Sequence, residues 1–165
     1  MAQGKDFTSL GGNYSIGIGK DEHISVVSEG LRTFIEGSTK ADILHIGHES
    51  NAKTFNVKDC MVVQKDGNDQ LVLRNKFVDS NVFNGGAGVD TLVLPGKRED
   101  YNFIKNQSGA KIECVETGAK NCFASYEIVA FSDDKNTAYS MQEILKDSKS
   151  PTELPAAANK NLIEL

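Results

Sequence analysis

The sequence contains no tryptophan, and its 165 residues include only three prolines and three cysteines. So few cysteines, in an odd number, exclude the disulfide framework of small secreted domains. No stretch approaches the roughly 20 consecutive apolar residues that a membrane-spanning helix requires. The first residues also lack the apolar core of a cleaved signal peptide. We therefore expect no membrane span and no N-terminal signal peptide.

Positive charge is also scarce, because 18 Lys and Arg residues stand against 23 Asp and Glu residues and give a net charge of −5. The basic residues are scattered, so a nucleic-acid backbone would find little to neutralise here. We expect no nucleic-acid partner. Hydrophobic residues make up 39% and charged residues 25% of the chain, which is typical of a globular domain.

Glycine is concentrated in residues 84–94, which read Asn-Gly-Gly-Ala-Gly-Val-Asp-Thr-Leu-Val-Leu. Alternating glycines permit a tight turn that brings carbonyl oxygens together. Asp90 adds a carboxylate, and the resulting oxygen cluster is what calcium prefers. The next residues predict a strand with Leu92 and Leu94 on one face and Val93 on the other. An ordinary alternative stays open, in which Asp90 caps the turn by accepting hydrogen bonds from backbone N–H groups.

Two weaker copies of this pattern occur at residues 33–46 and 60–73. Asp42, Asp69 and Asp90 are each followed by aliphatic residues two and four positions later, and the aspartates are separated by 27 and 21 residues. Internal repetition is typical of stacked β architectures. We therefore expect the three aspartates to lie in similar, stacked turns.

The segment 85–93 fits G-G-x-G-x-D-x-U-x and resembles the calcium-binding repeat of RTX (haemolysin-type) proteins. Tyr101, Glu127, Phe131 and Asp133 occupy places similar to those that follow the last repeat in such secreted bacterial proteins. The resemblance covers about residues 81–145, with weaker support back to residue 33. RTX repeats follow one another directly, whereas these are spaced apart, so a regular β-roll with a calcium ladder is not expected.

The resemblance implies a calcium-associated structural or binding module of a secreted or cell-surface bacterial protein, exported by type I secretion. Its role would be adhesion, export-coupled folding or assembly, with a protein or cell-surface ligand as partner. The candidate calcium ligands are Gly85, Gly86, Gly88, Asp90, Asp69, Asp66 and Asp42. The alternative is a metal-free β scaffold subunit of a phage or secretion-apparatus assembly, for which we expect a stable oligomer.

No motif nominates a catalytic centre. The sequence has no G-x-S-x-G, H-E-x-x-H, P-loop or Cys-x-x-Cys pattern. His45 stands where the other two copies carry Val72 and Val93, which predicts a packed or outward-facing strand residue. We therefore expect that the protein is not an enzyme.

The predicted fold class is mainly β, with stacked β-roll or β-sandwich-like strands, decayed Gly/Asp turns and one short C-terminal helix. We expect a hairpin near residues 14–27 and antiparallel strands from about 98 to 132. The helix is expected within 137–147, where Ser140 can cap it and Met141, Ile144 and Leu145 form an apolar stripe. The predicted divisions are a flexible lead-in (1–12), a single RTX-like β domain (13–147) and a flexible tail (148–165).

Cys114 and Cys122 flank a predicted hairpin loop at residues 116–121. Two alternatives remain open. The two thiols can face each other and form a disulfide in an oxidising compartment, or all three cysteines stay reduced.

Overall fold

The computed structural model describes the backbone of residues 7–9, 14–18, 23–28, 33–37, 39–47 and 58–146. Within these ranges it describes side chains from residue 34 onward, except that of residue 135. The predicted tail 148–165 lies outside the described residues, as does the predicted lead-in apart from residues 7–9, which form a strand.

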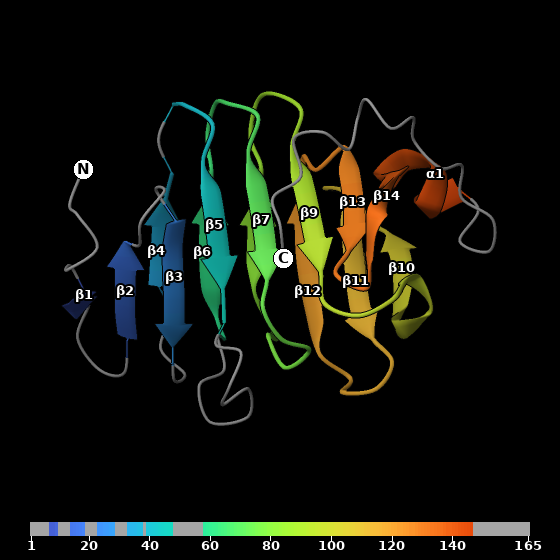
Figure 1. Ribbon diagram of the computed structural model, residues 1–165, viewed down its shortest axis with the longest axis horizontal. Helices are drawn as coiled ribbons and strands as arrows, with labels where there is room; N and C mark the ends of the chain where they lie inside the picture. The colour runs from blue at the N-terminus through green and yellow to red at the C-terminus, as the bar shows by residue number, and fades with distance from the viewer. Residues whose placement is uncertain are drawn as a thin grey trace.

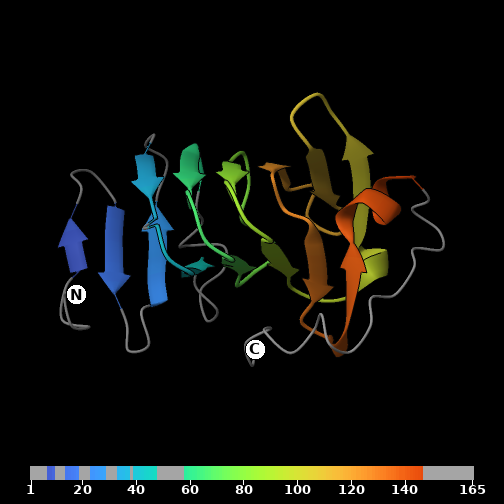
Figure 2. The same ribbon diagram turned by 90° about the horizontal axis from the view of Figure 1, so that it is seen from above.

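The mainly β prediction is confirmed, because two mixed sheets form two layers with one short helix at the C-terminal end (Figure 1). Sheet A has the strand order β1 (Phe7–Ser9), β2 (Tyr14–Ile18), β3 (His23–Ser28), β5 (Ile43–Ile46), β7 (Gln70–Leu73), β9 (Thr91–Leu94), β13 (Ile128–Phe131) and β14 (Asp134–Ser140). Sheet B has the order β10 (Tyr101–Lys105), β11 (Ala110–Cys114), β12 (Lys120–Ala124), β8 (Val82–Asn84), β6 (Cys60–Val63) and β4 (Thr33–Glu36). Side chains are described for the last five strands of sheet A and for all of sheet B. Figure 2 shows the two layers from above.

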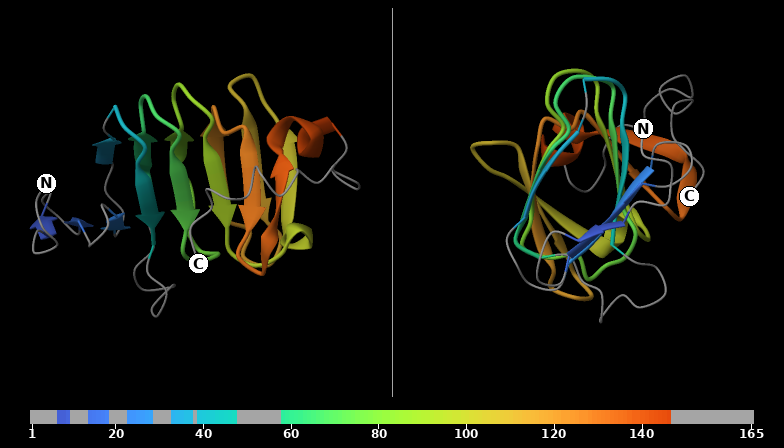
Figure 3. Two further views of the ribbon diagram at one scale, coloured as in Figure 1. Left: turned by 45° about the horizontal axis from the view of Figure 1, so that its top comes forward. Right: turned by 90° about the vertical axis from the view of Figure 1, so that its left-hand side faces the viewer.

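The chain crosses from sheet B to sheet A four times, in β4–β5, β6–β7, β8–β9 and β12–β13. We call each such unit of strand, turn and strand a rung. Neighbouring rungs pair in parallel in both sheets. Seen along the stack, the turns of successive rungs superpose (Figure 3, right). The predicted stacking of similar turns is therefore confirmed, and the architecture is a short β-solenoid.

The antiparallel prediction for residues 98–132 is right for β10, β11 and β12. It does not foresee the parallel pairing of β12 with β8 and of β13 with β9, although β13 also pairs antiparallel with β14. The reason is that β10 and β11 form an insertion between the third and fourth rungs, preceded by a 3-10 helix (Arg98–Asp100). β12 and β13 then resume the solenoid path.

The core lies between the sheets and consists of side chains stacked in register. Ile35, Val62, Phe83 and Phe123 form one row from sheet B. The rings of Phe83 and Phe123 stack with centroids 5.3 Å apart. Sheet A contributes Leu44, Leu71, Leu92 and Val129 in one row and Ile46, Leu73, Leu94 and Phe131 in the next. The predicted inward orientation of Leu92 and Leu94 is confirmed, since both belong to this core.

His45 lies on the outer side of sheet A, in register with Val72 and Val93, and it is buried. Its Nδ1 atom lies 3.2 Å from Nη1 of Arg74. The prediction of a packed strand residue at His45 is confirmed. The neighbouring Val93 and Ala130 are also buried.

The C-terminal helix α1 (Met141–Lys146) begins directly after β14. The Ser140 hydroxyl accepts a hydrogen bond from the Glu143 backbone N–H at 3.4 Å, as the predicted cap requires. Met141 and Ile144 are buried, and Leu145 packs against the core. The predicted hairpin near the N-terminus is confirmed in the backbone by the antiparallel pair β2 and β3. Within the described part of the chain, no helix has the length and apolarity to cross a membrane.

Of the two alternatives for the cysteines, the one in which Cys114 and Cys122 face each other is excluded by the hairpin register. In the β11–β12 hairpin, Lys111 pairs with Cys122, and Cys114 lies one step beyond the opposite end of the register. Cys114 is buried in the core, whereas Cys122 is on the outer face and partly exposed. All three cysteines are free thiols, because the hairpin register places these two on opposite sides of the sheet.

Candidate functional site at the stacked turns

Four acidic residues form a ladder where the turns enter sheet A. The Asp42 backbone N–H donates to Oδ1 of Asp69 at 2.7 Å, and the Asp69 N–H donates to Oδ1 of Asp90 at 2.8 Å. The Asp90 N–H in turn donates to Oε2 of Glu127 at 2.9 Å. The carboxylates of Asp69, Asp90 and Glu127 thus each hold the main chain of the preceding rung. We call Asp42, Asp69, Asp90 and Glu127 the aspartate ladder.

The main-chain carbonyls of the ladder are used as well. The Asp42 carbonyl accepts from the Gln70 N–H, and the Asp69 carbonyl accepts from the Thr91 N–H, both at 2.8 Å. The Asp90 carbonyl accepts from Glu127 and Ile128. Backbone and side chain together therefore join each turn to the next rung.

Two ladder carboxylates are enclosed, since Asp69 is 1% exposed and Asp90 is 0% exposed. In both, the second oxygen, Oδ2, is buried and has no hydrogen-bond partner. Burial raises the pKa of Asp69 to about 6, and the neighbouring charges of Asp90, Asp42 and Asp66 add to the rise. Burial also raises the pKa of Asp90, with a further contribution from Glu127. Each carboxylate is thus half satisfied, with one oxygen paired and one not.

The predicted glycines serve the approach of one turn to the next. Gly86 and Gly88 have φ angles of 100° and 142°, a region that favours glycine. A Cβ on Gly86 would stand 1.7 Å from the Lys65 carbonyl oxygen, and one on Gly88 would stand 1.7 Å from that of Gly67. The two turns are also joined directly, because Ala87 N–H donates to the Lys65 carbonyl at 2.7 Å.

Gly85 makes room for the ladder itself. A Cβ at this position would lie 2.5 Å from Oδ2 of Asp90 and 2.2 Å from the Ser125 carbonyl oxygen. The corresponding residue of the preceding rung is Gln64, whose side chain turns inward instead. Its amide nitrogen donates to the Gln70 carbonyl at 3.0 Å, and its amide oxygen accepts from the Tyr126 hydroxyl at 2.6 Å. In this rung, the inward-pointing side-chain amide of Gln64 therefore takes the place of the first glycine of the repeat.

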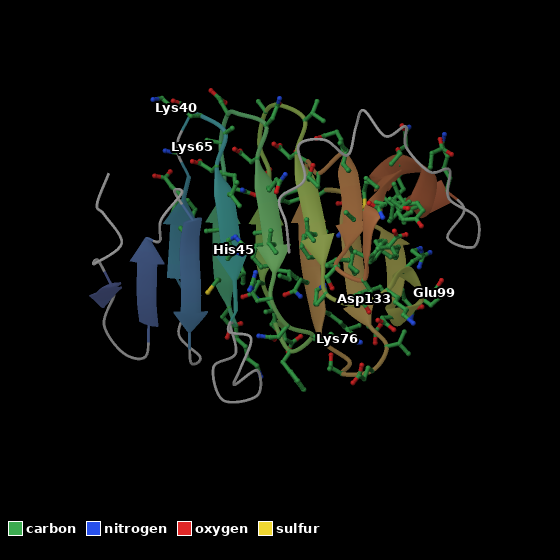
Figure 4. The ribbon with its side chains drawn as sticks, viewed as in Figure 1. Lys40, His45, Lys65, Lys76, Glu99 and Asp133 are labelled. Atoms are coloured by element: carbon green, nitrogen blue, oxygen red, sulfur yellow. The ribbon has the colours of Figure 1, made fainter. Side chains whose placement is uncertain are left out.

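Asp66 is the one predicted aspartate that does not join the ladder. It lies exposed on the turn, where its backbone bridges to Ala87. Lys40 and Lys65 lie at the same end of the molecule (Figure 4), and Lys65 forms an exposed ion pair with Glu36 at 3.5 Å.

A calcium ion in a protein requires six to eight oxygen ligands around one point. In the described residues, no group of three or more His, Cys, Asp and Glu side chains is placed to hold a metal ion. One oxygen each of Asp69 and Asp90, and the carbonyls of Lys65 and Ala87, already accept backbone hydrogen bonds. The free oxygens of Asp69 and Asp90 belong to different rungs. Calcium binding in these turns therefore stays a prediction.

Sequence reasoning missed a second ladder, at the start of the sheet B strands. The Cys60 N–H donates to Oδ1 of Asn81 at 2.9 Å, and the Asn81 N–H donates to Oδ1 of Asn121 at 3.1 Å. Both asparagines are buried. The signal was present in the sequence as Asn-x-Phe at residues 81–83 and 121–123. In the sequence, Glu127 stands out only through the RTX resemblance and not as the last member of the aspartate ladder.

The side chain of Lys76 joins the connecting segments at the end of the solenoid opposite the ladder turns. Lys76 Nζ lies 2.8 Å from Oε2 of Glu116 and 3.1 Å from Oδ2 of Asp100 (Figure 4). The hydrogen bond to Glu116 raises the pKa of Lys76, and the hydrogen bond from the Lys97 backbone lowers that of Asp100. These contacts fasten the β10–β11 insertion to the connector of the preceding rung.

An open depression of about 390 Å³ lies over the outer face of sheet A. The described residues that line it include Ile43, Asn68, Gln70, Val89 and Thr91. Asp69 is the single titratable residue among them. A pair of groups for acid and base catalysis is therefore not assembled by the described lining.

No protein-family model matches the chain, and no curated protein matches it in sequence.

Proposed function

We propose that the protein is a metal-free β-solenoid scaffold that serves as a structural or binding subunit of a larger assembly. The observation that carries the proposal is the use of the ladder carboxylates as acceptors for backbone N–H groups, from Asp42 through Asp90. A carboxylate oxygen that accepts a main-chain N–H in this way has a structural role at each of the three steps from one rung to the next.

The remaining features fit this role. Rows of stacked side chains give a continuous core between flat sheets, and flat sheets present broad surfaces to partners. The scaffold belongs to the same class of function as subunits of phage or secretion-apparatus assemblies.

The test is the thermal melting temperature of the full chain in a chelator and after addition of several millimolar calcium. A scaffold of this kind stays folded in the chelator and melts at the same temperature in both conditions. A chain that is unfolded in chelator and folds only with calcium overturns the proposal.

The second candidate is the calcium-associated module of a secreted or cell-surface protein, exported by type I secretion. The specific support for it is the pair of buried Oδ2 atoms on Asp69 and Asp90, which have no partner. A cation near these oxygens would offset the charge that burial penalises. Calcium at millimolar concentration would then stabilise the stack after export.

The same titration separates the two candidates when it includes Asp90→Asn. For the calcium-associated module, the melting temperature rises with calcium in the natural chain and the rise is lost in Asp90→Asn. Asp59→Asn is the matched control, since Asp59 is exposed and is neither a member of the ladder nor a candidate calcium ligand.

A further inference from the structure

The outward-facing side chains of the two sheets differ in how exposed they are. On sheet A, the outward row that contains Val72, Val93 and Ala130 is 2% exposed at each of these residues. On sheet B, the outward row contains Phe34, Met61, Val82 and Ile104, which are 58%, 47%, 43% and 48% exposed. We call these four residues the apolar stripe.

Phe34, Met61 and Val82 are adjacent in the stripe, whereas Cys122 and Lys111 stand between Val82 and Ile104 in the same row. Phe34 pairs with Met61, and Met61 pairs with Val82. Val82 pairs with Cys122, and Ile104 completes the row beyond Lys111. Single exposed apolar residues are common on protein surfaces, whereas a contiguous apolar row on a flat face marks an interaction site.

Charge at this face favours a second copy as the occupant. The outward positions of the sheet B strands carry Glu36 and Glu113 against Lys111 and Lys120, so two negative and two positive charges cancel. Glu113 and Lys120 also form an ion pair at 3.7 Å. The whole chain carries −5, so this neutral face is one where two copies can approach without charge repulsion.

The strand order gives the face a self-complementary layout. A twofold axis along the strands, between β8 and β12, places β4 over β10 and β8 over β12 of the second copy. Phe34 of one copy then lies over Ile104 of the other, Met61 lies over Lys111, and Val82 lies over Cys122. Equivalent patches that meet in this way form the isologous interface of a cyclic dimer.

We propose that the chain forms a homodimer through the apolar stripe on the outer face of sheet B. The inference deepens the scaffold function proposed above and rests on it, since it names the surface and the partner. Because the stripe is narrow, the interface belongs to the small class, and the dimer forms with a dissociation constant in the micromolar range.

Sedimentation equilibrium of the full chain in chelator tests the proposal. We expect the mass to rise from 17.9 kDa towards twice that value as the concentration passes from low to high micromolar. Met61→Lys and Val82→Lys keep the mass at that of the monomer throughout. Val115→Lys is the matched control, because Val115 is 59% exposed but lies outside the stripe, and this variant dimerises like the natural chain.

A natural chain that stays monomeric at all concentrations overturns the proposal. So does a dimer that survives both lysine substitutions in the stripe, or one that Val115→Lys abolishes equally. Thermal melts of the same samples establish that each variant is folded. A folded monomer in chelator removes the dimer alone, whereas a chain unfolded in chelator removes the scaffold function.

Discussion

Asp90 accepts, through Oδ1, the hydrogen bond of the Asp69 backbone N–H at 2.8 Å, across 21 residues of sequence. Through this contact, the side chain of Asp90 serves as the acceptor for the main chain of the preceding turn of the solenoid. Both residues are enclosed, so neither the donor nor the acceptor has water as an alternative partner. The stability of the stack therefore depends on the acceptor more than on the negative charge.

This dependence predicts different outcomes for Asp90→Asn and Asp90→Ala. The amide keeps an acceptor for the Asp69 N–H and removes a buried charge, so we expect its free energy of unfolding to match or exceed that of the natural chain. Alanine leaves the N–H buried and unpaired, and we expect a loss of about 1–3 kcal/mol. Urea denaturation measures both. If the two variants are equally destabilised, the charge matters and the acceptor does not.

The raised pKa of Asp69 predicts that stability depends on pH. The pKa lies at about 6 in the folded chain, above the ordinary value of 3.8. The folded state therefore binds the proton more tightly than the unfolded state, and the resulting stabilisation is complete below pH 3.8 and lost as the pH rises through about 6. The expected change is on the order of 3 kcal/mol from this group.

Asp69→Asn is the variant that checks this origin. Urea denaturation between pH 4 and pH 7 should show a smaller fall in stability for Asp69→Asn than for the natural chain. If the free energy of unfolding falls with pH as steeply in Asp69→Asn as in the natural chain, the pH dependence comes from another group.

Gly86→Ala is predicted to disrupt the contact between stacked turns. Its Cβ would meet the Lys65 carbonyl oxygen at 1.7 Å, and neither backbone can move away without breaking the turn. We expect a loss of roughly 2–4 kcal/mol, which exceeds the strain of positive φ alone. Gly118→Ala is the matched control, because Gly118 has a φ of 73° with no atom within 4 Å of the added Cβ. Equal losses in both variants would show that turn packing is unimportant.

Thiol chemistry checks the register of the β11–β12 hairpin. Cys122 is partly exposed, whereas Cys60 and Cys114 are buried. Below micromolar concentration, where the chain is monomeric, a thiol reagent should label Cys122 rapidly in the folded chain, and the other two cysteines only after unfolding. Mild oxidation should yield no intramolecular disulfide between Cys114 and Cys122. Recovery of that disulfide by peptide mapping would mean that the register differs.

Much of the fold could be predicted because the repeat has a direct physical cause. An aspartate followed by aliphatic residues at alternate positions marks a turn, a strand and an inward face, and Asp42, Asp69 and Asp90 each obey this pattern. The stacking followed from the repetition of that unit. The helix was found because Ser140 and the residues after it carry both a cap and an apolar stripe.

The rest depended on contacts between distant residues. The fourth rung has a shorter turn and carries Glu127 in place of an aspartate, so the repeat is hidden there. The pairing of β12 with β8 spans the β10–β11 insertion and has no local signal. The repeat places Asp42, Asp69 and Asp90 in stacked turns, as the structure does, but the sequence could not tell whether Asp90 would face an ion or a neighbouring N–H, since both uses require the same residue.

The β10–β11 insertion also bears on protein engineering. The chain leaves sheet A after Leu94, adds β10 and β11 to the end of sheet B, and resumes the solenoid path at Lys120, where the fourth rung continues the registers of the third. A solenoid that accommodates a whole hairpin at one junction without losing its repeat offers that junction as a place for grafting. Foreign loops or small domains with closely spaced ends can be displayed there, as long as Lys76 keeps its anchoring carboxylates.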